Sequence, residues 1–389
     1  MIESPVWGQA PARPQIPLPL RADVVVVGGG ISGTSLAYWL GKGGANVLLL
    51  ERARLAAGAS GRNAGFLLAG VASNYADAVS KHGRGLAAEV WAFTLENNRR
   101  LAELLEGRAG WRGGGSWTVA ASPEEAVALQ NSAQLLREDG LPGDWVPAAG
   151  VPGPGLGGLL NPADGELHPV ELVVLLADTA TAIVAEGVEV IGIEPSGSGV
   201  RVQTAVGEVA AGAVVLATNG YTRQLLPGIA IDPVRGQMLA TDAAQPLSER
   251  PIYTEQGFVY WRQLADRRVL VGGFRHRAVA EEIGYKERPT PAVQRHIDAY
   301  LSTLGVRSQV THRWAGVMGF TPDGLPLVGA VPGAAGVYLC AGYSGHGMGF
   351  AFNCARLLTD SILGGAQLPA WLSAGRAQLS PRPMGGSVP

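Results

Sequence analysis

The run DVVVVGGGISG, residues 23–33, carries the strongest structural signal in this chain. Its consecutive valines predict a strand buried on both faces, because β-branched side chains pack well in parallel sheets. The glycines that follow match G-x-G-x-x-G, the turn that lets a pyrophosphate approach the start of a helix. Apolar residues continue at helical spacing to Leu40. The run therefore predicts a dinucleotide-binding unit. The residues expected to contact the dinucleotide are Gly28, Gly30, Ile31, Ser32 and Gly33.

A second strand, Val47–Leu50, ends in the carboxylate of Glu51. Glu51 lies close to the ~20-residue spacing at which this motif places an acid against the ribose hydroxyls of adenosine. A carboxylate there repels a 2′-phosphate, so NADP is disfavoured and NAD and FAD remain. The competing interpretation is a surface glutamate that merely ends a strand.

Further along the chain, periodicity predicts alternating helical and strand segments. The expected helical regions are 74–141, 169–186, 291–304 and 350–363, and a Gly/Pro-rich loop is expected at 147–162. Strands are expected at 188–193, 199–204, in the run 214–220, within 236–274 and at 336–340.

Composition excludes several functional classes. The 389 residues are 47% hydrophobic and 16% charged, with a formal net charge of -2 and no basic run, which disfavours nucleic-acid binding. The six histidines and two cysteines show no metal-ligand spacing, and Cys340 and Cys354 are expected to be buried, inert thiols. The first twenty residues lack a signal-peptide pattern, and no apolar stretch reaches the ~18 residues of a membrane helix, so a cytoplasmic protein is expected.

Four more segments carry a family resemblance: GASGRNAG at 58–65, ATNG at 217–220, TPDGLP at 321–326 and GYSGHGMG at 342–349. Together with residues 23–33, they resemble the D-amino-acid oxidase-like family of FAD-dependent amine and amino-acid oxidoreductases. The S-G-R-N and S-G-H-G forms are most similar to its gamma-glutamylputrescine oxidase branch. The resemblance extends from about residue 23 to residue 363.

The resemblance implies an α/β fold in which a Rossmann-like FAD-binding domain of the glutathione-reductase type is interleaved with an α+β substrate domain. The substrate domain would contain a mostly antiparallel sheet. The expected FAD-binding domain comprises residues 20–75, 150–235 and 310–370, and the substrate domain 76–149 and 236–309. Residues 1–19 and 371–389 are expected to be extended termini.

The resemblance also implies a non-covalent FAD site. No cysteine lies in residues 314–320 and no histidine in residues 58–65, where a covalent tether would be sought. The helix after the GYSGHGMG loop would direct its positive end at the flavin N1/C2=O edge. His346 would lie against the flavin; a loop histidine that satisfies neighbouring carbonyls is the alternative. Beyond the glycine turn, the expected cofactor contacts are Glu51, Arg52, Ala59, Ser60, Arg62, Asn63, Ala64, Gly65, Val190, Ala217, Thr218, Asn219, Gly345, His346, Gly347, Met348 and Gly349.

The substrate residues are expected in the strand-rich region, and the candidates are Tyr260, Arg262, Arg275 and His276. The arginines and the histidine could hold a carboxylate and the tyrosine could line an amine pocket. Equally, they could be inter-strand charges and core aromatics. Sarcosine oxidase-like members carry a lysine where this chain has Gly349, which counts against a simple N-methyl amino acid.

The predicted activity is oxidation of a C–N bond in a small amine or amino acid. A hydride would pass to flavin N5, the imine would be hydrolysed, and O2 (giving H2O2) or another acceptor would take the electrons. The alternatives are a non-catalytic flavin-binding subunit, an NAD(P)H-linked flavoprotein reductase and an NAD-dependent dehydrogenase. The reductase would need a second G-x-G-x-x-G turn between a strand and a helix, and usually C-x-x-C. The sequence has no C-x-x-C and predicts no second turn of that kind.

Overall fold

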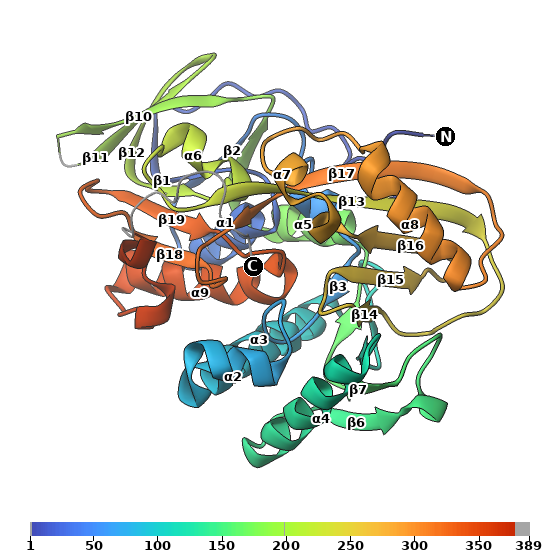
Figure 1. Cartoon of the computed structure of the whole chain (residues 1–389). Helices are drawn as coiled ribbons and strands as arrows, with labels where there is room; N and C mark the ends of the chain where they lie inside the picture. Colours follow the sequence, from blue (N-terminus) through green and yellow to red (C-terminus); the bar gives the residue numbers. More distant parts are fainter. Residues whose placement is uncertain (1, 198, 378–389) are drawn as a thin grey trace. The chain divides into compact units, whose positions relative to one another are not determined.

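The computed structural model describes residues 2–197 and 199–377, which form two compact units (Figure 1). Unit 1 comprises Met1–Val6, Arg62–His168 and Arg235–Gly316. Unit 2 comprises Trp7–Gly61, Pro169–Val234 and Val317–Pro389. The expected α/β fold class is confirmed. The assignment of cofactor and substrate binding to separate domains stays a prediction, as do their boundaries, and residues 378–389 of the expected C-terminal extension lie outside the described residues.

Unit 2 is built on a mixed sheet whose strand order is β10-β11-β12-β1-β2-β9, with β19 beside β12 and β18 beside β19. Strands β9, β2, β1, β12 and β19 run parallel, and Val24 pairs with Val47 on one side and Ala213 on the other. The strands are β1 (Arg21–Val27), β2 (Val47–Glu51), β9 (Ala182–Glu186), β10 (Val190–Ser196), β11 (Gly199–Thr204), β12 (Gly207–Leu216), β18 (Leu327–Ala330) and β19 (Val337–Ala341).

Helices α1 and α9 pack along each other in unit 2 (Figure 1). Trp39 of α1 donates from Nε1 to the carbonyl of Phe352 in α9 at 3.2 Å, and their rings lie 5.1 Å apart. The helices of this unit are α1 (Ile31–Lys42), α5 (Pro169–Thr179), α6 (Thr222–Leu225) and α9 (Gly347–Gly364). Short 3-10 turns occupy Ala59–Gly61, Asn219–Tyr221, Ala370–Leu372 and Ala374–Ala377.

Two expectations for unit 2 were wrong in detail. Residues 182–186 form strand β9 and are not a continuation of α5, because Ala182-Ile183-Val184-Ala185 pairs in register with β2 at the sheet edge. Helix α9 begins at Gly347, inside the expected glycine loop. The glycines of its first turn gave the sequence pattern no apolar periodicity there.

Unit 1 contains a second large sheet, ordered β17-β13-β16-β15-β14-β5-β7-β6. From β13 to β6 its pairs are antiparallel apart from β14–β5. Its strands are β5 (Ser116–Val119), β6 (Asp144–Pro147), β7 (Gly157–Asn161), β13 (Asp232–Ala243), β14 (Ile252–Thr254), β15 (Val259–Gln263), β16 (Arg268–Gly273) and β17 (Val310–Phe320). A small sheet joins β3 (Phe66–Leu67), β8 (Gly165–Glu166) and β4 (Arg112–Gly113) in the order β3-β8-β4.

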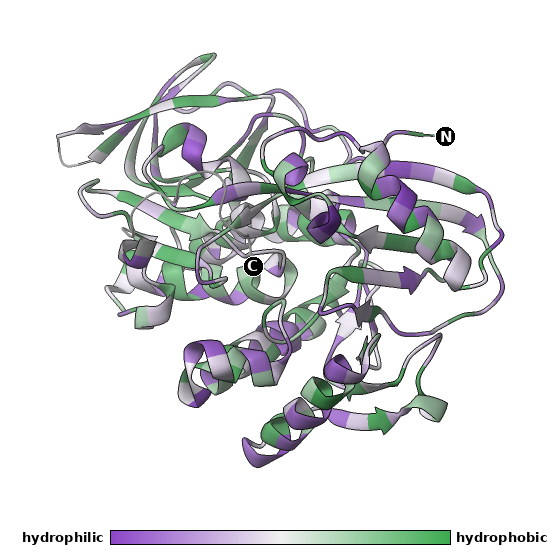
Figure 2. Cartoon of the chain, in the orientation of Figure 1, coloured by the Kyte–Doolittle hydropathy of each residue, from purple (hydrophilic) through white to green (hydrophobic). Residues whose placement is uncertain are grey.

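The helices of unit 1 are amphipathic, and α3 and α4 carry both hydrophilic and hydrophobic residues along their lengths (Figure 2). Helix α8 contacts β16 and buries Val293, Ile297 and Leu301 in the same cluster as Trp261. The helices are α2 (Tyr75–His82), α3 (Arg84–Leu105), α4 (Pro123–Glu138), α7 (Val279–Glu282) and α8 (Pro291–Thr303), with 3-10 turns at Ala148–Gly150 and Arg275–Arg277.

Several strands of unit 1 were not predicted, among them β3, β4, β5, β6, β7, β8 and β17. Strand β5 interrupts the expected helical region, and β7 lies in the expected loop. The glycines that suggested a loop are required by close packing in the sheet. A Cβ on Gly158 would lie 2.9 Å from the Thr118 carbonyl oxygen, and one on Gly157 would lie 2.3 Å from the Trp145 ring.

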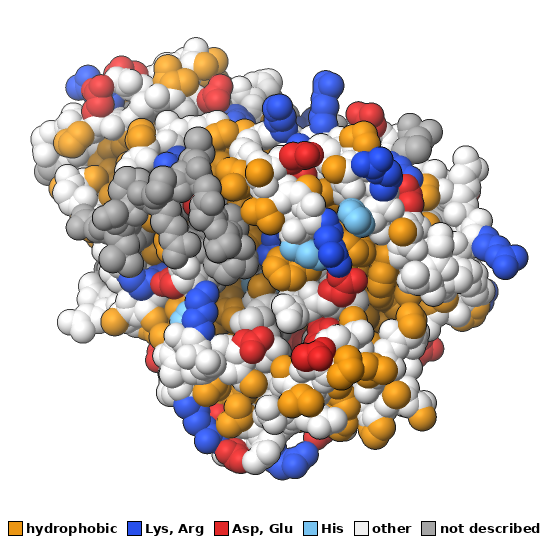
Figure 3. All heavy atoms as spheres, in the orientation of Figure 1, with side chains coloured by type: hydrophobic (Ala, Val, Ile, Leu, Met, Phe, Trp, Pro, Cys, Tyr) orange, Lys and Arg blue, Asp and Glu red, His pale blue; other side chains and the backbone are white. Residues whose placement is uncertain are grey.

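Charge is distributed without a dominant sign, since acidic and basic side chains are interspersed on the face in Figure 3. Within the described residues, no helix combines the length and the apolar character needed to cross a bilayer.

Candidate active site

The carboxyl ends of β1, β2, β12 and β19 lie at one edge of the unit 2 sheet, because these strands are parallel neighbours. The residues that follow them are Gly28, Arg52, Ala217 and Gly342. Ligands of open α/β sheets bind at this edge. Tertiary structure therefore brings the G-x-G-x-x-G turn, the ATNG segment and the GYSGHGMG loop to the same edge of the sheet.

Each motif glycine meets a specific steric limit. Gly28 has φ +111°, and a Cβ there would lie 2.8 Å from the Ala217 carbonyl oxygen. A Cβ on Gly30 would lie 2.8 Å from Ser60 Oγ, and one on Gly33 only 1.8 Å from the Gly28 carbonyl oxygen. Ser60 in turn accepts a hydrogen bond from the Ile31 N–H at 2.9 Å, at the start of α1. This turn has the tight strand-to-helix geometry that a pyrophosphate site requires.

The Glu51 carboxylate joins the end of β2 to the glycine turn. Its Oε2 accepts the Gly29 N–H at 2.7 Å and its Oε1 accepts the Ala53 N–H at 2.8 Å. Burial raises the pKa of Glu51, while these two hydrogen bonds and the Arg52 charge oppose that shift. An ionised carboxylate has about four acceptor positions, so acceptor capacity remains for ribose hydroxyls.

Helix α9 begins immediately after the GYSGHGMG loop. The loop turns through left-handed residues, with φ of 50° at Ser344 and 95° at Gly345. His346 occupies the N-cap position without a side-chain capping bond; its N–H donates to the Tyr343 carbonyl, and its own carbonyl accepts from Gly349. The positive end of an 18-residue helix is thus presented beside this loop, at Gly347 and Met348.

Tyr343 was not predicted, although it lies inside the GYSGHGMG loop. Its buried hydroxyl accepts a hydrogen bond from Ser32 Oγ at 2.8 Å and lies 3.2 Å from Cys340 Sγ. Burial raises its pKa well above the usual range. A buried tyrosine hydroxyl normally has a hydrogen-bond partner. The partner of Tyr343 is distant in sequence, so only the fold reveals it. Cys340 and Cys354 are both buried free thiols, as predicted.

The remaining unit 2 candidates differ in their environments. Asn219 has φ 44° and accepts the Gly342 N–H at 3.0 Å on Oδ1, which joins the ATNG and GYSGHGMG segments. Ala217 N donates to Val27, and the Thr218 hydroxyl lies 3.0 Å from that of Thr222. The Arg52 guanidinium lies 4.1 Å from the Tyr221 ring centre. Val190 belongs to the buried core of the sheet. Ala59 and Ser60 lie in a 3-10 turn.

The Arg62–Gly65 loop is anchored within unit 1. Arg62 donates from Nη1 to the Ala315 carbonyl at 2.9 Å, and its own carbonyl accepts from Trp314 Nε1 at 2.8 Å. Asn63 Oδ1 accepts the Gly65 N–H at 2.7 Å, which closes a tight turn. Arg62 also pairs with Glu287 at 3.3 Å.

Arg262 supports this loop from β15. Its side chain is 4% exposed, and Nη1 donates to the carbonyls of Ala64 at 2.9 Å, Gly65 at 3.1 Å and Leu167 at 3.0 Å. Its Nε lies 3.0 Å from Glu166 Oε2, and burial followed by the nearby Arg112 lowers its pKa to about 9. Arg262 therefore holds the backbone of this loop in place through hydrogen bonds to its carbonyls.

Tyr260 and Arg275 belong to an aromatic cluster that also contains two residues not predicted from sequence, Tyr253 and Phe66. The rings of Tyr253 and Tyr260 lie 5.8 Å apart, and Phe66 lies 5.5 Å from Tyr253. Burial raises the pKa of Tyr260 to about 12, so its hydroxyl stays protonated. Burial lowers the pKa of Arg275, and the nearby Tyr260 and Tyr253 act in the opposite direction. Tyr253 lies in a three-residue strand, too short to show a period.

His276 follows Arg275 but lies among different groups. Its Nε2 is 3.6 Å from Glu255 Oε2, and its ring lies 4.6 Å from that of Phe258. Burial, followed by the charges of Arg277 and Arg275, lowers its pKa to about 4. His276 is therefore a neutral imidazole near pH 7.

Residues 23–361 match the family described as FAD dependent oxidoreductase. The chain belongs to this family. It is 26% identical over 376 residues to gamma-glutamylputrescine oxidoreductase of Escherichia coli K12, covering 90% of this chain and 85% of that protein. It is 28% identical over 372 residues to glycine oxidase of Geobacillus kaustophilus, covering 88% and 93%. The crystal structure of glycine oxidase from Geobacillus kaustophilus superposes with a TM-score of 0.76 at 23% identity, covering 92% of this chain and 99% of that one.

As a member of this family, the protein is an FAD-dependent oxidoreductase that acts on amine or amino-acid donors. The residues of unit 2 fit the FAD that the family uses. Gly28, Gly30 and Gly33 leave space that any Cβ would fill, Glu51 offers a carboxylate, and α9 begins without a side-chain cap. The expectation of FAD in place of NAD is therefore confirmed.

Proposed function

We propose that this enzyme oxidises the C–N bond of a small amine or amino acid that carries a carboxylate, and that Arg275, Tyr253 and Tyr260 bind it. The observation that supports this is the half-buried Arg275 guanidinium near two tyrosines whose hydroxyls stay protonated. A guanidinium and two hydroxyl donors form a recognition set for one carboxylate, and they gain strength in a site of low dielectric constant.

FAD, when bound, would supply the two-electron acceptor for a hydride from the α-carbon of the neutral amine, and water would hydrolyse the resulting imine. The chain's own residues hold the substrate and keep water away. Tyr253, Tyr260 and Phe66 provide an apolar wall that favours the uncharged amine. O2, leaving as hydrogen peroxide, is the proposed acceptor, with another electron carrier as the alternative.

The cofactor contacts are also proposals residue by residue. Gly28 to Gly33 and Ser60 would hold the pyrophosphate, Glu51 the adenosine ribose, and the α9 N-terminus the electron-rich edge of the flavin. We propose a non-covalent cofactor, since both cysteines are buried free thiols. The cytoplasmic location stays a prediction.

The test is an anaerobic screen of amines and amino acids for loss of the oxidised-flavin absorbance of the purified holoenzyme. Arg275→Met should raise KM for a carboxylate-bearing substrate by about 10- to 100-fold, because a charge-assisted hydrogen bond is lost. The control is Arg277→Met, which removes a neighbouring exposed arginine. Bleaching by amines without a carboxylate, with Arg275→Met unchanged, would contradict the proposed substrate class.

A further inference from the structure

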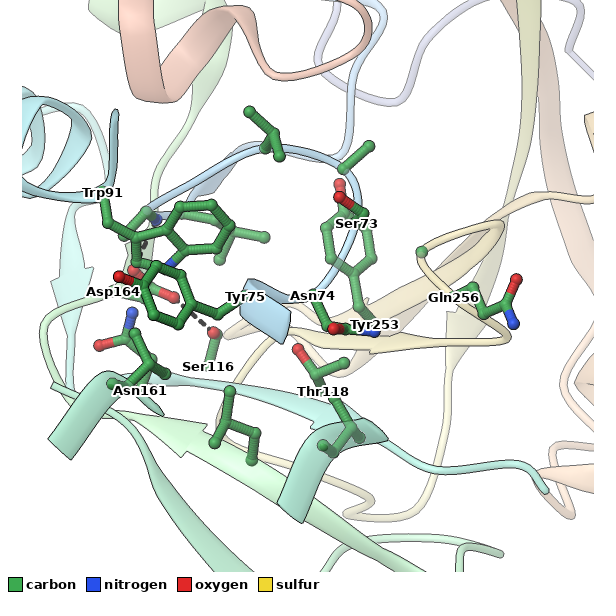
Figure 4. A pocket seen from close by; sticks show the side chains of 18 of the residues that line it. Ser73, Asn74, Tyr75, Trp91, Ser116, Thr118, Asn161, Asp164, Tyr253 and Gln256 are labelled. Atoms are coloured by element: carbon green, nitrogen blue, oxygen red, sulfur yellow. Dashed lines mark hydrogen bonds between the residues drawn. The ribbon is translucent and has the colours of Figure 1, made fainter. Parts of the chain in front are cut away.

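Unit 1 contains a cavity that none of the predicted cofactor or substrate residues lines (Figure 4). It lies among α2, α3, α4, β5, β7 and β14, with about 60 Å³ of space open to a water-sized molecule. A single water needs ~10–15 Å³, so the cavity has room for about four groups of that size. The polar and aromatic lining includes Asn74, Tyr75, Trp91, Ser116, Asp164 and Tyr253.

The charge of the lining has one sign. It contains two acids, Asp164 and Glu125, and no Lys, Arg or His among its residues, all of which lie in the described ranges. The carboxylate of Glu125 accepts backbone N–H groups from Ala121 and Gln256, both at 2.8 Å. Glu125 therefore has a structural role, because it holds the turn after β14, which includes the exposed lining residue Gln256.

Asp164 is the acid that remains available to a ligand. It is 4% exposed; Oδ1 accepts the Ala69 N–H at 2.8 Å and Oδ2 accepts the Ser116 hydroxyl at 2.7 Å (Figure 4). Because an ionised carboxylate has about four acceptor positions, these two bonds leave about two for further donors. Burying an ionised carboxylate without a cationic partner costs folding free energy. A cation bound beside Asp164 would offset that cost.

Aromatic faces complete the environment. The rings of Tyr75 and Trp91 lie 4.9 Å apart in a T-shaped pair, and Tyr253 closes another wall. Aromatic faces attract cations, most strongly in desolvated sites. The turn that borders the cavity has left-handed backbone at three consecutive residues, Glu255 (φ 50°), Gln256 (φ 56°) and Gly257 (φ 79°). Such strain at non-glycine residues is typical of ligand sites.

We propose that this cavity binds a small alkylammonium group, with the Asp164 carboxylate as its counter-charge and Trp91, Tyr75 and Tyr253 as its aromatic walls. A metal ion is a poorer occupant, because the described residues include no group of three side chains able to hold one. Of these four residues only Tyr253 also belongs to the proposed substrate-binding set; Asp164, Trp91 and Tyr75 do not. Occupation of the cavity requires no oxidation of the ligand.

The proposal carries a pH dependence. Burial raises the pKa of Asp164 to about 7, while the Ser116 hydroxyl and the Ala69 N–H oppose that shift. The other titratable groups that face the cavity are Tyr75 on α2, Glu125 on α4 and Tyr253 on β14. Burial raises the pKa of both tyrosines, so neither ionises near pH 7. Binding should weaken by about tenfold between pH 8.5 and pH 6, as Asp164 takes up a proton.

The experiment is a calorimetric titration of the holoenzyme with methylammonium chloride under anaerobic conditions, with tetramethylammonium chloride as the probe that is too large and has no N–H donor. We expect saturable binding of methylammonium alone. Asp164→Asn should weaken it by about 10- to 100-fold, the loss of one charge-assisted interaction. The matched control, Asp144→Asn, changes an exposed aspartate of the same unit and should leave binding unchanged.

Ser116→Ala provides a second test that retains the charge. Removing the hydroxyl raises the pKa of Asp164 further, so the midpoint of the pH dependence should move upward. This shift is measurable even if Asp164→Asn does not fold. No methylammonium binding at pH 8.5, or equal binding at pH 6 and pH 8.5, would overturn the proposal. Either result would leave the flavin-linked oxidation of amines, measured by bleaching, unaffected.

Discussion

Ser32 and Tyr343 are 311 residues apart in the chain, yet the Ser32 hydroxyl donates to the Tyr343 hydroxyl at 2.8 Å. Ser32 lies in the first turn of α1 and Tyr343 lies just before α9. The bond therefore joins the two helices whose N-termini are proposed to face the cofactor. The Cys340 thiol, 3.2 Å from the same hydroxyl, completes a buried polar chain.

Tyr343→Phe removes this link and leaves the ring in place. We expect the free energy of unfolding to fall by about 1 kcal/mol, the usual net value of one buried hydrogen bond, and the affinity for FAD to fall with it. Denaturant titration and flavin fluorescence on dilution would measure the two effects. Tyr338→Phe, on β19 and half-buried, serves as the control and should change neither.

Gly33→Ala tests the steric argument for the glycine turn. The added Cβ would lie 1.8 Å from the Gly28 carbonyl oxygen, so the turn must open and the protein should be isolated without flavin absorbance. Gly228→Ala adds a methyl group where no atom lies within 4 Å and should keep its flavin. A yellow Gly33→Ala protein with normal stability would refute this account of the turn.

Arg262→Met tests whether this arginine is a backbone clamp. The change leaves the carbonyls of Ala64, Gly65 and Leu167 without their donor and the buried Glu166 without one partner. Removing one member of a buried pair typically costs about 3–5 kcal/mol. Chemical denaturation should show such a loss, and the double variant Arg262→Met/Glu166→Gln should recover part of it. A raised KM at unchanged stability would instead assign Arg262 to the substrate.

The raised pKa of Asp164 predicts how stability depends on pH. The folded chain holds a proton on Asp164 up to about pH 7, whereas the unfolded chain releases it near the ordinary value of 3.8. The stabilising contribution is therefore complete below about pH 4 and is lost as the pH rises to 7, the reverse of a salt-bridged aspartate. Comparing thermal midpoints at pH 5 and pH 8, we expect the wild type to lose more stability than Asp164→Asn. A parallel loss in both proteins would contradict the assigned pKa.

Local pattern predicted those features that depend on short stretches of chain. The valines of β1, the glycines at 28, 30 and 33 and the apolar face of α1 specify a strand, a turn and a helix through contacts within a few residues. The candidate site residues of the GYSGHGMG and ATNG segments were found through family resemblance, and their junction at one sheet edge follows from the parallel pairing of β1, β12 and β19.

Tertiary structure alone decided the features that depend on partners distant in sequence. Strand β7 carries the glycines of a loop, and only its pairing with β5 and β6 makes it a strand. Arg262 and Arg275 read alike in the sequence, but one is held by loop carbonyls and the other lies beside two tyrosines. Asp164 has an ordinary turn sequence, NPAD, around it. Its raised pKa arises from burial among groups on α2, α4, β5 and β14, because desolvation depends on everything that surrounds a carboxyl and not on its neighbours along the chain.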